Sequence, residues 1–192
     1  MSKLRKSCYW TDAVGGTTRR AGWVYPQRSE ARLIAHILVI GYGNPLRGDD
    51  GAGLFVARQL SKLSELSAHD NIKILSLHQL TPELADDISK AKLVIFIDAS
   101  WNQPPGHLSC KMVMPGPSIT GITTHHLEPS GLLTFTQGLY GVFPDTVIII
   151  TIGGNSFGFV EDLSPSVAAA LPKLEKVLVA YLLHMTHKLN KR

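Results

Sequence analysis

Two aspartates and one histidine, widely separated along this 192-residue chain, have side chains that suit metal chemistry. Asp50 follows a loop rich in glycine and aspartate, Asp98 directly follows the apolar run 93–97, and His125 lies in a polar loop that leads into an expected helix. Two carboxylates and one imidazole suit a divalent ion of intermediate softness, such as zinc or nickel. Three protein ligands would leave coordination positions open for water or for a group of a substrate.

A purely structural interpretation stays open for each of these side chains. Asp49 and Asp50 precede an expected helix, where carboxylates cap free backbone N–H groups and interact favourably with the helix dipole. Asp98 can hydrogen bond to the backbone of its own loop. The adjacent His125 and His126 can be loop residues without a function.

Alternating strand and helix patterns predict the elements that must position these residues. Continuous apolar runs predict strands that are buried on both faces, and 107–114 is a weaker candidate for a strand. Apolar residues at helical spacing predict helices, with one start at Thr81-Pro82-Glu83, another at Ser164-Pro165 and a kink at Pro172. The expected strands are 37–42, 72–77, 93–97 and 146–152, and the expected helices are 54–66, 81 onward, from about 125 or 130 to 140, and 164 onward.

This order of elements predicts an α/β fold, a single doubly wound domain with a mostly parallel central sheet and helices on both faces. Ligands of such sheets bind outside the carboxyl ends of the strands. Asp50 and Asp98 both follow strands at that edge. They converge if the first and third strands are neighbours, as in the common doubly wound orders.

The glycine-rich loop does not match a nucleotide-binding loop. Gly41 and Gly43 begin a dinucleotide-binding pattern, but Leu46 stands where the third glycine is needed. The Asp49-Asp50 pair stands where a phosphate-binding loop needs Lys followed by Ser or Thr. Two aspartates at a helix N-terminus would also repel a pyrophosphate. A nucleotide-binding function is therefore disfavoured.

The cysteines and the charge distribution exclude further classes of protein. Cys8 and Cys110 are too few for a disulfide framework, and they lack the spacing of a structural zinc site. Cys110 lies in an apolar stretch and is expected to pack inertly in the core. Residues 1–36 hold seven of the 19 basic side chains and only two of the 15 acidic ones, so the rest of the chain has no basic excess for nucleic acid.

Residues 1–35 lack helical or strand periodicity, and we expect a disordered basic extension in front of a domain that covers 36–188. No apolar run reaches the ~20 residues that a membrane span needs. We expect a monomeric cytoplasmic protein that binds neither nucleic acid nor a membrane.

Three segments together resemble a known family. They are GYGNPLRGDDGAG at 41–53, VIFIDA at 94–99 and TTH at 123–125. Their order and spacing resemble the hydrogenase maturation proteases, the peptidase family that trims the C-terminus of the [NiFe]-hydrogenase large subunit. The resemblance covers roughly residues 36–186.

The resemblance implies that Asp50, Asp98 and His125, rather than His126, form the catalytic and metal-contacting set. Some relatives carry Glu at the first of these positions, and Asp50 is shorter by one methylene. The implied reaction is one endoproteolytic cut, which releases a short C-terminal peptide from a large-subunit precursor already loaded with nickel. The nickel would come with the substrate.

The alternative is a chaperone that senses nickel in the same precursor without cutting it. Asp49 could assist as a base, but we expect it to cap the helix.

Overall fold

The computed structural model describes residues 36–116 and 127–191. Within these ranges, a mixed sheet is built from β1 (His36–Tyr42), β2 (Ile72–Leu77), β3 (Ala91–Ser100), β4 (Leu108–Met112) and β5 (Thr146–Gly153). The strand order is β2-β1-β3-β5-β4. All neighbouring strands are parallel except β4, which pairs with β5 in the antiparallel direction. The expected mostly parallel sheet is confirmed, and β1 and β3 are neighbours.

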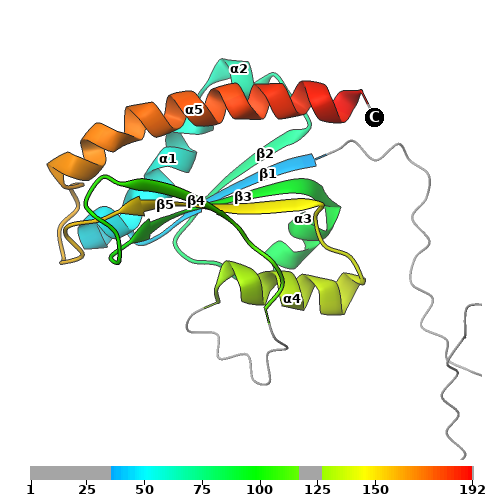
Figure 1. Ribbon diagram of the computed structural model, residues 1–192, viewed down its shortest axis with the longest axis horizontal. Coiled ribbons are helices and arrows are strands. Elements are labelled where there is room, and N and C mark those ends of the chain that lie inside the picture. Colours follow the sequence, from blue (N-terminus) through cyan, green and yellow to red (C-terminus); the bar gives the residue numbers. More distant parts are fainter. Residues whose placement is uncertain (1–35, 117–126, 192) are drawn as a thin grey trace, which may run out of the picture. The chain divides into compact units, whose positions relative to one another are not determined.

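Helices cover both faces of this sheet, as expected for a doubly wound fold (Figure 1). One face is covered by α1 (Ala52–Leu60), α2 (Ser64–Ser67) and α5 (Pro165–Asn190), and the other by α3 (Leu84–Lys90) and α4 (Pro129–Tyr140). Successive side chains of the central strands point to opposite faces of the sheet, and each face has its own apolar core. In β1, Ile37 and Val39 pack with α1 and α5, whereas Leu38 and Ile40 pack with α3 and α4.

Two glycines let α1 lie unusually close to the central strands. A Cβ on Gly41 of β1 would lie 2.1 Å from the carbonyl oxygen of Gly53, and a Cβ on Gly53 would lie 2.2 Å from that of Ile97 in β3. Both distances are shorter than any side chain tolerates, so glycine is required at both positions. Because Asp50 comes three residues before Gly53 and Asp98 follows Ile97, this packing brings both aspartates to the same edge of the sheet.

The helices differ from the expected ones at two places. The expected helix 54–66 breaks into α1 and α2, although Leu66 remains buried against α5. The helix expected from Thr81 begins at Leu84, because residues 81–83 form a turn in which the Thr81 carbonyl accepts from the Leu84 N–H. The last helix is one element that runs through Pro172, and the kink expected at this residue stays a prediction. Among the described residues, no helix has the length and hydrophobicity required to cross a bilayer.

The expectation that Cys110 packs in the core is wrong. Cys110 lies on β4, which is the edge strand of the sheet, and its side chain is exposed. Hydrophobic periodicity identified the strand, but an edge strand has a neighbour on one side only. Its residues are therefore less covered than those of the central strands.

Candidate active site

A cleft of about 820 Å³ opens at the carboxyl edge of the sheet, where β1 and β3 end. Both Asp50 and Asp98 line it, so the structure confirms that these two residues come together. We refer to this space as the cleft. Its lining residues are Tyr42, Asn44, Arg47, Asp50, His78, Gln79, Leu80, Asp98, Ala99, Ser100, Trp101, Leu127, Glu128, Thr151 and Phe157.

Asp50 lies in a short 3-10 segment, η1 (Pro45–Gly51), that connects β1 to α1. Its carboxylate accepts a hydrogen bond of 2.9 Å from the backbone N–H of Asn44, at the start of the same turn. The helix α1 receives no side-chain cap hydrogen bond, so the capping interpretation of Asp50 is wrong for α1. One carboxylate oxygen is fixed by the loop, and the residue lines the cleft.

Asp98 is held by two hydrogen bonds at the end of β3. Its Oδ1 accepts 2.8 Å from the backbone N–H of Ala99, and its carboxylate also accepts from the Tyr42 hydroxyl. The pKa of Asp98 is raised to about 6, mainly by burial and also by the nearby charge of Asp50, whereas the two hydrogen bonds oppose the rise. A carboxyl with a raised pKa beside a second carboxylate is typical of a functional site that binds a cation or a proton.

Tyr42 was not singled out by its type or spacing, yet it contacts the candidate site directly. It is the last residue of β1, and the β1–β3 pairing brings it beside Asp98. Burial raises the pKa of Tyr42 strongly, and so do the charge of Asp98 and its hydrogen bond. Tyr42 therefore stays protonated and donates to Asp98.

Asp49 does not cap α1, contrary to expectation. Its side chain is fully buried and accepts from three backbone N–H groups, those of Asn155, Ser156 and Ser164, which follow β5 in the sequence. Burial raises its pKa, but the three N–H donors outweigh burial and hold the pKa of Asp49 below its ordinary value. Asp49 is an ionised group that connects distant segments.

Other polar side chains complete the cleft. Arg47 and Glu128 line it, and neither forms an ion pair with another residue of the described ranges. His78, the residue after the end of β2, also lines the cleft. It does not form a three-residue metal-binding cluster with Asp50 and Asp98, and no such cluster exists among residues 36–116 and 127–191.

The third expected ligand, His125, lies outside the described residues, as does His126. The nearest described residues after them, Leu127 and Glu128, both line the cleft. The grouping of His125 with the two aspartates therefore stays a prediction.

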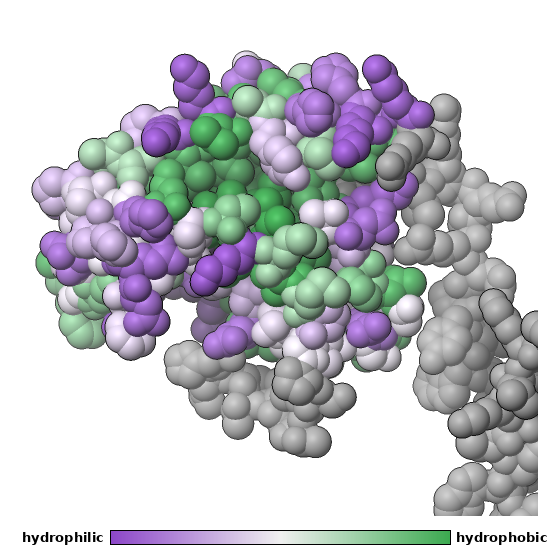
Figure 2. Space-filling view, in the orientation of Figure 1, coloured by the Kyte–Doolittle hydropathy of each residue, from purple (hydrophilic) through white to green (hydrophobic). Residues whose placement is uncertain are grey.

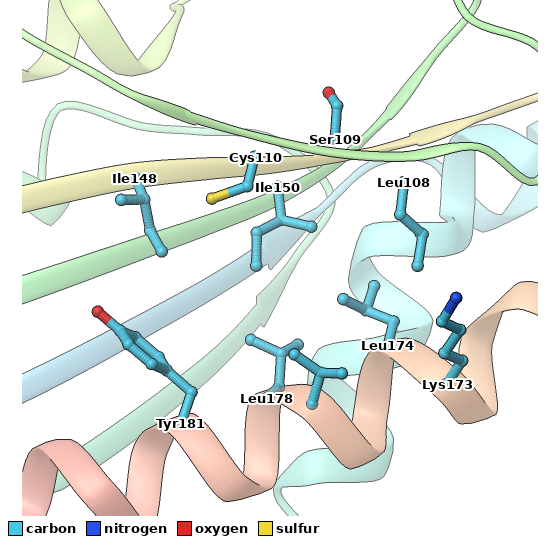
Figure 3. A pocket seen from close by; sticks show the side chains of 10 residues that line it. Leu108, Ser109, Cys110, Ile148, Ile150, Lys173, Leu174, Leu178 and Tyr181 are labelled. Carbon is cyan, nitrogen blue, oxygen red and sulfur yellow. The ribbon is translucent and has the colours of Figure 1, made fainter.

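A second cavity of about 390 Å³ lies between α5 and the edge strand β4 (Figure 3). Leu174 and Leu178 of α5 face Ile148 and Ile150 of β5 across it. The same region is a hollowed apolar area in the space-filling view (Figure 2). No carboxylate or imidazole lines it, so it lacks the ligand types expected for the cation site.

Comparison with known proteins gives a structural match and no sequence match. No protein-family model and no curated protein matches the sequence. A hydrogenase 2 maturation peptidase from Thaumarchaeota archaeon SCGC_AB-539-E09 is similar in structure, with 29% identity, a TM-score of 0.56, and coverage of 77% of this chain and 97% of that one.

Two further solved structures share the fold. The [NiFe] hydrogenase maturation protease HycI from Thermococcus kodakarensis has 24% identity and a TM-score of 0.61 over 77% of this chain and 92% of its own. The hydrogenase maturating endopeptidase HybD from E. coli has 22% identity and a TM-score of 0.62 over 78% and 93%. The chain therefore has the fold of the [NiFe] hydrogenase maturation proteases, across most of its length and at low sequence identity.

Proposed function

We propose that this protein is a hydrogenase maturation endopeptidase, which removes a short C-terminal peptide from the nickel-loaded precursor of a [NiFe]-hydrogenase large subunit. The observation that carries the proposal is the pairing of Asp50 and Asp98 in one cleft at the carboxyl edge of this fold. The similarity to the thaumarchaeal maturation peptidase supports the same activity. The protein would act as a monomer in the cytoplasm.

Asp50, Asp98 and His125 would contact the nickel that arrives with the substrate. Two carboxylates and an imidazole are suitable ligands, and an incomplete set of three would gain its missing ligands only from a loaded precursor. The assignment of His125 rests on the TTH segment at 123–125, which resembles the family pattern.

The reaction consumes one water molecule. The hydroxyl of water adds to the scissile carbonyl carbon, the C–N bond breaks, and the remaining proton goes to the nitrogen of the released peptide. The Tyr42 hydroxyl and the Ala99 N–H both donate to the Asp98 carboxylate. Together they would hold this carboxylate in a fixed orientation. A cation between Asp50 and Asp98 would stabilise their ionised forms, because it offsets the repulsion between the two negative charges.

The proposal is tested by incubating the full chain with a nickel-loaded and a nickel-free precursor and weighing both by mass spectrometry. We expect a single loss of mass, equal to a C-terminal peptide, in the loaded precursor only. Asp98→Ala should abolish the loss. Stable binding of the loaded precursor without any loss of mass would instead identify a non-cleaving, nickel-sensing chaperone.

A further inference from the structure

The buried carboxylate of Asp49 organises a loop that follows β5. Its Oδ2 accepts 2.7 Å from the Asn155 N–H and 2.9 Å from the Ser156 N–H, and its Oδ1 accepts 2.7 Å from the Ser164 N–H. These donors lie 106, 107 and 115 residues away in the sequence. Both oxygens are thus used, and both ends of the segment 154–164, here called the β5–α5 loop, are attached to one side chain.

The backbone of η1 adds two further contacts to the same loop. The Gly48 N–H donates 2.6 Å to the Val160 carbonyl, and the Asp49 N–H donates 2.9 Å to the Ser156 carbonyl. Gly48 has a φ of +55°, and a Cβ there would lie 2.8 Å from the Ser156 carbonyl oxygen. The loop therefore packs directly on the turn that also carries Asp50.

The β5–α5 loop contributes an apolar side of the cleft. Phe157 comes from the middle of the loop and lines the cleft together with Trp101 and Leu127. Its ring lies over Gly154, with one ring carbon 2.4 Å from the point where a Cβ on Gly154 would stand. The position of this ring thus depends on the path of the loop, and the path depends on the contacts with Asp49.

We infer that Asp49 is a positioning residue, which holds the β5–α5 loop in place so that Phe157 presents an apolar surface to the substrate segment that enters the cleft. The inference rests on the proposed function. It assigns adjacent residues to different tasks: Asp50 faces the cleft and its cation, whereas Asp49 faces away from the cleft and fixes its apolar side. Only a carboxylate performs this task, because both of its oxygens accept. The amide of asparagine would turn an N–H₂ group toward at least one N–H donor.

Hydrogen exchange of the full chain tests the contact itself and needs no substrate. In Asp49→Asn we expect the amides of Asn155, Ser156 and Ser164 to exchange at least about tenfold faster than in the wild type, since a charge-assisted hydrogen bond is lost. The amides of β3 should keep their protection. Asp86→Asn, the same change at an exposed position on α3, is the matched control and should alter none of these rates. Unchanged exchange of the three amides in Asp49→Asn would overturn the inference.

Steady-state cleavage of the nickel-loaded precursor tests the positioning role. Asp49→Asn and Phe157→Ala should each raise KM by about tenfold with kcat nearly unchanged, because both remove uniform binding of the substrate. The double variant should be hardly worse than Phe157→Ala alone, since Asp49 acts through Phe157. Fully additive effects, or a wild-type KM in Asp49→Asn despite faster exchange, would contradict the inference.

Gly154→Ala provides the second variant, in case Asp49→Asn fails to fold. Its methyl group would displace the Phe157 ring, and it would also lie 3.1 Å from the Cβ of Asp49, so exchange of the Asn155 and Ser156 amides is measured in the same variant. We expect a raised KM with normal protection of the Asn155 and Ser156 amides. A normal KM in Gly154→Ala would mean that the Phe157 ring does not contact the substrate, and the inference would fail. If the wild type cleaves no precursor, the proposed function fails, but the exchange measurement still decides whether Asp49 holds the loop.

Discussion

Tyr42 and Asp98, at the ends of the neighbouring strands β1 and β3, are joined by a hydrogen bond from the phenol to the carboxylate. The bond is made inside a cleft that also contains Asp50, so the partly buried Asp98 lies beside a second acid. Burial and the charge of Asp50 favour the protonated form of Asp98, and the hydrogen bond from Tyr42 favours the ionised form. The pKa of about 6 is the balance of these opposing effects.

Replacing Asp98 by asparagine should stabilise the metal-free protein while it abolishes processing. The folded-state pKa is raised from 3.8 to about 6, so the contribution of Asp98 to stability is complete at low pH and is lost as pH rises through about 6. Above that pH the wild type carries an unfavourable, partly buried charge, which Asp98→Asn removes. We expect a gain of about 1–3 kcal/mol in the free energy of unfolding at pH 8.

Urea denaturation in the presence of a chelator, at pH 8 and at pH 4, measures this difference. At pH 4 the gain should be close to zero, because Asp98 is then neutral in the folded wild type. If Asp98→Asn instead has a lower free energy of unfolding at pH 8, the surroundings stabilise the ionised carboxylate, and the prediction is wrong.

Tyr42→Phe should weaken the binding of a divalent cation mainly at low pH. Without the hydroxyl, the ionised form of Asp98 loses a hydrogen bond, and the pKa of Asp98 rises further. Nickel affinity, measured by titration calorimetry, should fall roughly tenfold at pH 6 and much less at pH 8. Tyr140→Phe, at an exposed position on α4, is the matched control. An equal loss at both pH values would contradict the electrostatic explanation.

Asp49→Asn should destabilise the protein at neutral pH and have progressively less effect in acid. The folded-state pKa of Asp49 is lowered, so its contribution to stability is present above the ordinary aspartate pKa of 3.8 and is lost as pH falls below it. We expect a loss of about 2–3 kcal/mol at pH 7, because buried N–H donors are left without an acceptor. Denaturation of Asp49→Asn and of Asp86→Asn at pH 7 and pH 3 separates this effect from a general effect of removing a charge. A loss at pH 3 as large as that at pH 7 would be inconsistent with an ionised Asp49.

The convergence of Asp50 and Asp98 could be predicted from the sequence because it follows from general rules of parallel sheets. Each aspartate closes the carboxyl end of a strand or the turn after it, and these ends lie at one edge whenever the strands are parallel neighbours. The pairing of β1 with β3 satisfies that condition. No knowledge of side-chain packing was needed for this part of the site.

The role of Asp49 could not be predicted from local spacing, because its three donors lie more than 100 residues away. A carboxylate before a helix matches a cap in sequence, and only the tertiary path of the β5–α5 loop brings competing donors to it. The prediction that Cys110 packs in the core was wrong for a similar reason. Periodicity identifies a strand, but the position of that strand at the edge of the sheet depends on the topology of the whole chain.

His125→Ala should abolish processing, whereas His126→Ala should leave it nearly unchanged. The two residues are adjacent and of the same type, so the pair controls for changes in charge and loop composition. Loss of one of three metal contacts should reduce kcat/KM by at least about 100-fold, and loss of a neighbouring imidazole by about twofold at most. Mass spectrometry of the nickel-loaded precursor measures both rates. The opposite order of effects would transfer the ligand assignment to His126.

Removal of residues 1–33 should leave both folding and processing unchanged. Every described residue of the cleft comes from position 42 or later, and the two apolar cores are formed from residues 37–189. The removed segment carries much of the basic charge of the chain, so the sequence pI should fall while the acidic cleft is untouched. Thermal unfolding and the precursor assay on the truncated protein measure the two properties. A protein that no longer folds after the truncation would show that the extension contributes to the core, and a folded protein with a raised KM would show that the basic segment binds the precursor.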